Sequence, residues 1–380
     1  MSKQVRLGDH TTKIGSGQTP LGGWSSYAQS GIPLIRSQNV MMGSFSEKGL
    51  VYISDSVDKL MRGSRVCPGD VLLNITGASI GRVCVVPDRI CPANVNQHVC
   101  IIRCDESINP EYVAAILASP RFQAFIWGSQ AGGTRQALTK QMIEEFLIPW
   151  LPIEMQRQIA SHLKSQLAEL EKIRQASVVQ LNEVARLADS LVFDSIERSE
   201  TTKRSLGDIL IEIKSGIGKT WSEYPVLGAT RAGLAPAKEP PGKLAEKYKP
   251  AFPGTVFYNP MRILIGSIAF VDEEDTPGIT SPDYVVLHGK GGIVDSRWFY
   301  FWLRSPIGEE CIGSLARGAV RERMLFSRLA EGEIHLPSFT AQRQASKALM
   351  GLKHMRDKLK LQLDEINLLS QKLLSKTFEN

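Results

Sequence analysis

Residues 68–86, with the sequence PGDVLLNITGASIGRVCVV, return as PGTVFYNPMRILIGSIAFV at residues 253–271. Seven positions of the first stretch find an identical residue 185 positions later, namely Pro68, Gly69, Val71, Asn74, Ile80, Gly81 and Val86. Shorter strings recur in the same order: Leu7-Gly8-Asp9 as Leu206-Gly207-Asp208, Ser119-Pro120 as Ser305-Pro306, and Gln156-Arg157-Gln158 as Gln342-Arg343-Gln344. The chain is therefore a tandem duplication. Two copies of this length predict a pseudo-two-fold molecule with two similar surfaces, not a solenoid.

The two copies differ in length in one region. The interval between equivalent residues is 199 positions at Gly8, 185 at Pro68 and 186 at Arg157, so the first copy carries about 14 extra residues (199 minus 185) before Pro68. Residues 9–67 and 208–252 should therefore differ most. If the copies bind different things, the difference should lie there.

The composition of the 380 residues is that of an ordinary soluble globular protein, with 43% hydrophobic and 22% charged residues, and the length allows two to four domains. No stretch approaches the roughly 20 apolar residues of a membrane span, and the start lacks the apolar core of a signal peptide, which predicts a cytoplasmic protein. The net charge of +6 is compatible with a nucleic-acid partner without requiring one. The six cysteines lack metal-ligand spacing, so we expect reduced thiols and no metal site.

Two long helices are the clearest local prediction. Residues 1–150 read as mixed α/β, with a helix at Pro110 to Ala118, but residues 153–197 contain neither Gly nor Pro. Apolar residues recur there in steps of three or four. The second copy repeats this pattern over residues 340–378. The apolar stripes comprise Ile159, Leu163, Leu167, Leu170, Ile173, Val178, Leu181, Val184, Leu187 and Leu191, and then Ala345, Leu349, Leu352, Met355, Leu359, Leu363, Ile366, Leu369 and Leu373.

A lone helix of about 45 residues, roughly 65 Å long, cannot bury such a stripe. We therefore expect the two helices to pair as an antiparallel coiled coil, which would place a globular domain at each end of a rod. The alternative is that each helix packs on the sheet of its own domain. The predicted fold is α+β: two mixed α/β domains, residues 1–151 and 200–337, separated by a pair of long helices, residues 152–199 and 338–380.

No catalytic constellation stands out. The string Gly216-Ile217-Gly218-Lys219-Thr220 ends like a phosphate-binding loop but lacks its first glycine. Tyr258-Asn259-Pro260-Met261 is incomplete as an amino-methyltransferase motif, and neither Pro87-Asp88 nor Pro282-Asp283 continues into a metal-binding nuclease signature. The aromatic run at residues 298–302 is better explained as core packing than as a base-stacking platform, because five adjacent rings cannot face one way.

The organisation resembles the specificity (S) subunit of Type I restriction-modification systems. In the first copy the resemblance lies in Gly132-Gly133-Thr134-Arg135-Gln136-Ala137-Leu138, Ile148-Pro149, Leu151-Pro152 and Gln156-Arg157-Gln158-Ile159-Ala160. In the second it lies in Arg317-Gly318-Ala319-Val320-Arg321, Leu336-Pro337 and Gln342-Arg343-Gln344-Ala345. The second copy lacks the Gly-Gly-Thr string and has a linker one residue longer before its Gln-Arg-Gln. The likeness spans both copies.

The resemblance implies a subunit that is no enzyme by itself. Two target-recognition domains would each bind one half of a bipartite site in double-stranded DNA, and the helices would set the distance between the halves. Two methyltransferase (M) and two restriction (R) subunits would be recruited, and S-adenosylmethionine, ATP and Mg²⁺ would belong to those partners. The alternatives are a self-contained DNA methyltransferase or nuclease with degenerate motifs, and a coiled-coil scaffold that does not bind DNA.

Candidate DNA contacts follow from base chemistry, since Arg and Lys suit guanine while Asn and Gln suit adenine. The densest cluster of such residues in the divergent part of the first copy is Arg36-Ser37-Gln38-Asn39. An ordinary solvated side chain or a phosphate contact is an equally open interpretation for each single candidate. The candidates are Lys13, Arg36, Gln38, Asn39, Arg62, Arg65, Arg82, Asn96 and Gln97 in the first copy, and Lys214, Lys219, Arg231 and Arg262 in the second.

Overall fold

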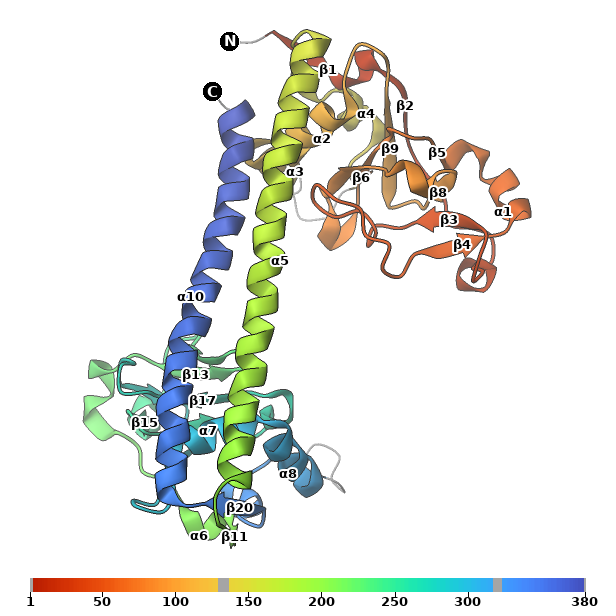
Figure 1. The fold of residues 1–380 in the computed structure, drawn as a ribbon. Helices are drawn as coiled ribbons and strands as arrows, with labels where there is room; N and C mark the ends of the chain where they lie inside the picture. The colour runs from red at the N-terminus through yellow and green to blue at the C-terminus, as the bar shows by residue number, and fades with distance from the viewer. Residues whose placement is uncertain (1–2, 129–136, 317–322, 379–380) are drawn as a thin grey trace. The chain divides into compact units, whose positions relative to one another are not determined.

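The structure is a computed structural model that describes residues 3–128, 137–316 and 323–378. It contains two compact units (Figure 1): Met1–Ala176 together with Leu363–Asn380 form unit 1, and Ser177–Gln362 form unit 2. Each unit holds the globular domain of one copy together with parts of both long helices. Two strings that carried the family resemblance, Gly132 to Gln136 and Arg317 to Arg321, lie outside the described residues.

The scaffold of unit 1 is a four-stranded antiparallel sheet with the order β2 (Thr11–Ser16), β9 (Val99–Cys104), β6 (Val71–Asn74) and β7 (Val83–Val85). Its core combines one face of these strands with α2 (Pro110–Ala118), whose Tyr112, Val113 and Leu117 are fully buried. β1 (Gln4–Arg6) and β10 (Leu147–Pro149) form a separate two-stranded antiparallel ribbon. This part also contains η1 (Leu7–His10), α3 (Pro120–Gly128) and α4 (Lys140–Glu144).

Unit 2 repeats this scaffold. Its sheet has the order β12 (Leu210–Glu212), β19 (Val285–Gly289), β16 (Val256–Tyr258) and β17 (Ile268–Phe270). Helix α7 (Ser296–Arg304) packs on it, with Trp298, Phe299, Tyr300 and Trp302 buried, which confirms the aromatic run as core. The edge ribbon is formed by β11 (Thr201–Ser205) and β20 (Glu333–Pro337). The other helices are α6 (Leu206–Ile209), α8 (Pro306–Ala316) and α9 (Phe326–Leu329).

The divergent regions form different small sheets. In unit 1 the order is β4 (Val51–Ile53), β3 (Ile32–Ile35), β8 (Ala93–Val95) and β5 (Arg65–Val66), joined by α1 (Asp55–Leu60) and η3 (Arg62–Ser64). Unit 2 has a hairpin of β13 (Leu227–Thr230) and β14 (Gly233–Pro236), and a pair of β15 (Lys249–Ala251) and β18 (Gly278–Thr280).

Most of the length difference lies in one connection. Residues 36–50 join β3 to β4, whereas residues 231–232 alone join β13 to β14. The extra residues predicted for the first copy therefore form a long loop, called loop 36–50 below.

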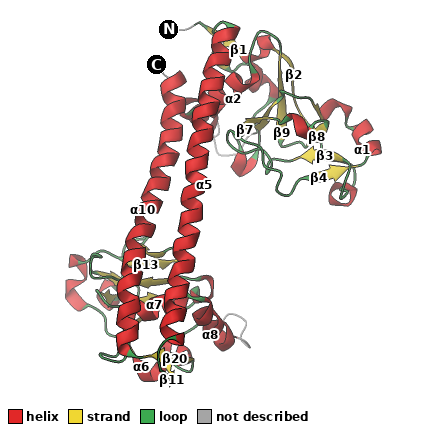
Figure 2. Cartoon of the chain, viewed as in Figure 1, coloured by secondary structure: helices red, strands yellow, loops and turns green. Residues whose placement is uncertain are grey.

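Both long helices are present, as α5 (Ile153–Glu197) and α10 (Phe339–Phe378) (Figure 2). Unit 1 contains the beginning of α5 with the end of α10, and unit 2 contains the end of α5 with the beginning of α10, so the helices are antiparallel. In unit 2, Ala188 and Val192 of α5 share one hydrophobic core with Ala345 and Leu349 of α10 and with the domain's own aromatic residues. The helices thus pack on each other and on the domain at once. No helix in the described residues is long and apolar enough to cross a membrane.

Unit 2 holds α10 through a buried ionic network. Asp272, at the end of β17, accepts hydrogen bonds from Arg297 of α7, and Lys353 of α10 pairs with Asp275 at 2.9 Å and with Asp272 at 3.5 Å. Burial pushes the pKa of Asp272 upward, but the bonds from Arg297 and from the Glu273 N–H outweigh it and hold that pKa below its ordinary value. In unit 1 the corresponding helix carries an exposed pair, Lys164 with Glu111 at 2.7 Å.

Candidate nucleic-acid interface

Loop 36–50 is organised by a buried asparagine. The Asn39 side chain is 0% exposed; its Oδ1 accepts the Arg36 N–H at 3.0 Å and its Nδ2 donates to the Ser46 carbonyl at 2.9 Å. A bridge between Val40 and Phe45 closes the tip. Asn39 was predicted as a base contact, but its amide is used within the loop. Here it shapes the surface that its neighbours present.

Arg36 and Gln38 converge on one backbone carbonyl. The Arg36 Nη2 donates to the Gly49 oxygen at 2.6 Å, and the Gln38 Nε2 donates to the same oxygen at 3.0 Å. The Arg36 guanidinium also lies over the rings of Trp24 and Tyr27, 5.8 and 5.7 Å from their centroids. Its buried Nε has no hydrogen-bond partner among the described residues. Gln38 is exposed, and its Oε1 and second N–H are not used by this bond.

Arg82 lies beside loop 36–50, because the β6–β7 turn is fastened to that loop. Asn74 Nδ2 donates to the Ser37 carbonyl at 2.8 Å, and the Gly43 N–H donates to the Val83 carbonyl at 2.8 Å. The Arg82 Nη1 reaches the sulfur of Met41 at 3.7 Å, a weak contact that leaves most of its donors available.

Asn96 and Gln97 complete this group from β8. The Asn96 N–H donates to the Ile35 carbonyl at 3.0 Å, next to Arg36, while its buried Oδ1 accepts the His98 N–H at 3.1 Å. Gln97 is exposed and its Nε2 lies 3.0 Å from the His98 Nε2. The structure thus gathers six predicted residues around β3 and β8: Arg36, Gln38, Asn39, Arg82, Asn96 and Gln97.

Lys13 and Arg65 form a separate group, on β2 and β5 of two different sheets. The Lys13 Nζ donates to the Arg65 carbonyl at 3.2 Å, and the Arg65 Nε donates to Asp58 Oδ1 at 3.0 Å. The hydrogen bond from Arg65 lowers the pKa of Asp58, although burial opposes it. Burial lowers the pKa of Lys13, with Arg103 adding to the effect. Arg65 therefore already has a carboxylate partner, whereas Lys13 keeps donors for an anion.

In unit 2, Arg231 lies beside the turn that carries Arg262. The Arg304 guanidinium donates to the carbonyls of Gly266, Ile268 and Arg231 at 3.1, 3.0 and 2.7 Å, which holds the β13–β14 and β16–β17 turns together. Leu264 and Ile265, in η8 (Ile263–Ile265), are 63% and 65% exposed. The predicted cations therefore sit beside exposed aliphatic side chains.

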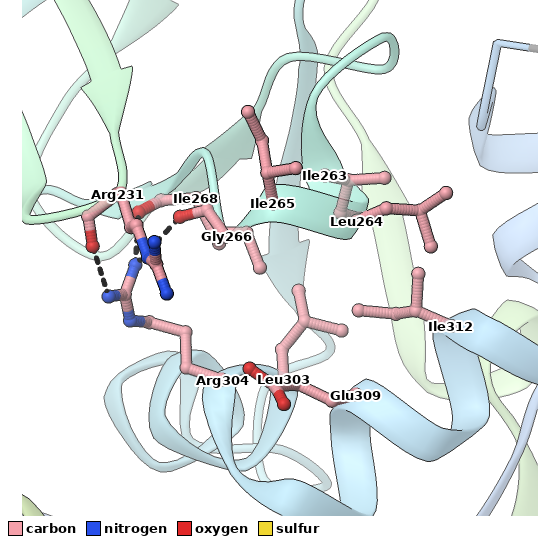
Figure 3. Close-up of a pocket in the computed structure, with 10 residues that line it drawn as sticks. All are labelled: Arg231, Ile263, Leu264, Ile265, Gly266, Ile268, Leu303, Arg304, Glu309 and Ile312. Carbon is pink, nitrogen blue, oxygen red and sulfur yellow. Dashed lines mark hydrogen bonds between the residues drawn. The ribbon is translucent and has the colours of Figure 1, made fainter. Parts of the chain in front are cut away.

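A pocket of about 540 Å³ opens between this turn and the α7–α8 corner (Figure 3). Its walls combine aliphatic side chains from Ile263, Ile268, Leu303 and Ile312 with polar groups from Arg231, Arg304 and Glu309.

Two tryptophans were missed among the candidates. Trp24-Ser25-Ser26-Tyr27 in η2 (Gly23–Ser26) recurs as Trp221-Ser222-Glu223-Tyr224 in η6 (Gly218–Glu223), and in both the Tyr N–H donates to the Trp carbonyl at 3.3 Å. Trp24 is 80% exposed beside Arg36, and the exposed Lys219 lies in the same turn as Trp221. The repeated Trp-Ser-x-Tyr string, visible in the sequence, could have identified them.

Comparison with known proteins defines the class. Residues 4–180 match the model of the Type I restriction modification DNA specificity domain. The Type I restriction enzyme EcoBI specificity subunit of Escherichia coli is 29% identical over 171 residues, which is 43% of this chain and 34% of that protein. The alignment thus spans about a third of the curated relative. Over residues 4–180 the chain is therefore similar to Type I restriction-modification specificity subunits.

Two solved structures support the fold. A chain from a study of complex assembly and conformational transition of the type I restriction-modification system has a TM-score of 0.64 and 16% identity, covering 99% of this chain and 97% of that one. The S subunit from M. genitalium has a TM-score of 0.56 and 15% identity, covering 100% and 96%. At these identities the likeness concerns the fold.

Proposed function

We propose that this chain is the DNA sequence-recognition subunit of a Type I restriction-modification complex. Residues 1–151 and 200–337 are its target-recognition domains, and residues 152–199 and 338–380 are its spacer helices. It binds a bipartite site in double-stranded DNA and recruits two M and two R subunits. Catalysis, with S-adenosylmethionine, ATP and Mg²⁺, belongs to those partners.

One observation carries the proposal: two copies of one scaffold present different polar and cationic surfaces at the same place. Unit 1 presents Arg36, Gln38 and Arg82 around loop 36–50, and unit 2 presents Arg231 and Arg262 around two short turns. A shared frame with different recognition surfaces suits two unlike half-sites on one duplex.

In unit 1, Gln38 is the proposed adenine contact, because it can offer one N–H and one oxygen to a base edge. Arg36 and Arg82 are the proposed guanine contacts. Trp24 adds an apolar face beside Arg36 that can contact a deoxyribose or a thymine methyl group. Asn39 and Asn96 do not contact DNA in this proposal; their hydrogen bonds hold loop 36–50 in place. Lys13 in β2 is the proposed phosphate contact of this unit, because Arg65 is already paired with Asp58.

In unit 2, Arg262 and Arg231 are the proposed base contacts, and Lys219 a phosphate contact. Leu264 and Ile265 lie next to Arg262 with more than half of their surface exposed. Apolar groups in that position favour thymine, whose methyl group faces the major groove. The second half-site is therefore expected to include a thymine beside a guanine.

The test is to map methylated adenines in cells that carry this chain with its M subunit. The expected result is one motif with two fixed parts and a non-specific spacer. A chain that methylates DNA alone when given S-adenosylmethionine would instead support a self-contained enzyme. A chain that assembles with M but leaves DNA unshifted and unmethylated would support a scaffold.

A further inference from the structure

The first glutamine of the repeated Gln-Arg-Gln string occupies the same buried position in both units. Gln156 in the first turn of α5 and Gln342 in the first turn of α10 are both 0% exposed. The second glutamines of the two strings, Gln158 and Gln344, are exposed. Burial thus restricts the residue type at Gln156 and Gln342, whereas it does not restrict it at Gln158 and Gln344.

In unit 1, Gln156 joins three segments of the chain. Its Oε1 accepts the Asn109 N–H at 2.9 Å, and its Nε2 donates to the Leu151 carbonyl at 2.8 Å and to the Ser107 carbonyl at 3.5 Å. Asn109 is itself the N-cap of α2, because its Oδ1 accepts the Tyr112 N–H at 2.9 Å. The start of the long helix is thus bonded to the start of the domain's central helix.

Unit 2 makes the same junction. The Gln342 Oε1 accepts the Asp295 N–H at 2.9 Å, and its Nε2 donates to the Pro337 carbonyl at 2.8 Å and to the Ile293 carbonyl at 3.0 Å. Asp295 caps α7 through the Trp298 N–H at 3.0 Å. In both units the glutamine oxygen accepts one backbone N–H and the glutamine nitrogen donates to two backbone carbonyls. We call the two arrangements the glutamine junctions.

We propose that the glutamine junctions fix the direction in which each long helix leaves its recognition domain, and so set how strictly the complex measures the spacing between the two half-sites. Gln156 and Gln342 are positioning residues in this scheme, which rests on the proposed function. A buried amide whose oxygen and nitrogen are both bonded resists tilting, because any tilt leaves a buried polar group unpaired.

The geometry makes a small tilt matter. A helix of about 45 residues is roughly 65 Å long, so a tilt of about 5° at its first turn displaces its far end by roughly 6 Å. One base pair adds about 3.4 Å along the duplex. A looser junction should therefore let the complex accept sites whose spacer is one base pair shorter or longer.

The test uses Gln156→Met, which keeps the volume and removes the hydrogen bonds, in the chain assembled with its M subunit. Methylation is measured on duplexes with the natural spacer and with one base pair added or removed. The preference for the natural spacer should fall about tenfold, the effect of one buried hydrogen bond, while the half-site bases stay the same. Gln342→Met should reduce the preference for the natural spacer in the same way. The double variant should methylate sites over the widest range of spacer lengths.

Two controls separate positioning from loss of stability. Gln158→Met changes the exposed glutamine two positions on and should leave the preference unchanged. Ile101→Ala removes buried volume from β9, in a hydrophobic cluster separate from the one that contains α2, and should lower the melting temperature without widening the accepted spacing. If Gln156→Met does not assemble, Gln342→Met makes the same test at the second junction, with the same expected direction.

An assembled and active Gln156→Met variant with unchanged spacing preference would overturn the inference. So would an Ile101→Ala variant that widened the accepted spacing as much. Failure of the proposed function is a different result, because the wild-type complex would then show no bipartite motif at all.

Discussion

The two units keep the same scaffold but differ in one connection. Both have a four-stranded antiparallel sheet in the same strand order, the same capped central helix and the same glutamine junction. Between their outer strands, unit 1 has loop 36–50 and unit 2 has a turn at residues 231–232. Identity is concentrated in the shared scaffold, at residues 68–86 and 253–271 and at the two Gln-Arg-Gln strings, and variation in these outer connections. This pattern is expected of a duplicated protein whose two copies bind the same partner subunits but different DNA half-sites.

A second difference lies in how each unit holds its helix. Unit 2 holds α10 through the buried Asp272, which is paired with the partly buried Arg297 and Lys353, whereas the exposed pair of Lys164 and Glu111 in unit 1 contributes little. The two attachments should therefore respond differently to pH and to substitution.

The largest expected effect comes from exchanging one recognition region. Replacing residues 1–150 with the corresponding region of another family member should change one half of the methylated motif completely and leave the other half intact. The physical reason is that each copy carries its own divergent loops on its own core. Methylome sequencing measures both halves at once. A swap that altered both halves, or neither, would show that the copies do not bind independently.

The next largest effect concerns the helices as a spacer. Repeating Gln175 to Val178 inserts four residues, which adds roughly 6 Å and slightly more than one turn, so the apolar stripe stays nearly in phase. We expect an active complex whose spacer is longer by about one or two base pairs, at about 3.4 Å each, with unchanged flanking bases.

Inserting two residues at the same place is the matched control. It rotates the apolar stripe of α5 away from the side on which Val184, Ala188 and Val192 are buried. Assembly should therefore be mostly abolished. Methylome sequencing of both variants decides the matter. An active four-residue variant with the original spacer would contradict the spacer model.

A smaller effect is expected at the ionic network of unit 2. Arg297→Met leaves the buried Asp272 with only the Glu273 N–H and Lys353 as partners and should cost about 3 kcal/mol at neutral pH. Since the pKa of Asp272 lies below its ordinary value in the folded chain, the stabilisation is present above the unfolded pKa and is lost as the pH falls through the folded one. The cost should therefore shrink below about pH 4.

Hydrogen exchange of the α7 and β17 peptides in the full-length chain measures this effect. Lys164→Met, which breaks the exposed pair in unit 1, should change exchange by less than about 1 kcal/mol at any pH. Equal effects of the two substitutions would mean that the two attachments do not differ.

The long elements could be predicted from the sequence because their pattern is local and repeated. The 3.6-residue period gave α5 its bounds, and the burial of Trp298 and Trp302 followed from the impossibility of five rings facing one way. The length of the insertion could be predicted from the intervals between equivalent residues of the two copies. Its place between β3 and β4 could not be predicted, because these strands are short and β3 is defined by its pairing with β4 and β8.

The candidate site was only partly predictable. Arg36, Gln38 and Asn39 are adjacent, yet Asn39 is turned inward because its amide closes the loop, and a linear string cannot show which of three polar residues does so. The pairing of Arg65 with Asp58 depends on how α1 packs. Gln156 was recognised as part of a repeated string, but its bonds to Asn109 and Leu151 join residues far apart in the chain.

The smallest effect is the sharpest test of loop 36–50. Arg36→Ala with Gln38→Ala should weaken recognition of one half-site by about 1–3 kcal/mol per lost base contact and relax the base preference there. Loss of a phosphate contact would instead weaken binding to all sequences alike and lower its salt dependence.

Asn39→Ala should act differently, because it removes the amide that orders loop 36–50. It should therefore impair the DNA contacts of Arg36 and Gln38 together. Arg231→Ala, in the other copy, should alter only the other half-site. Binding of the assembled complex to duplexes mutated in each half-site, over a range of salt concentrations, separates these outcomes. If the Arg36 and Gln38 double variant keeps both site preference and affinity, this loop does not recognise the bases.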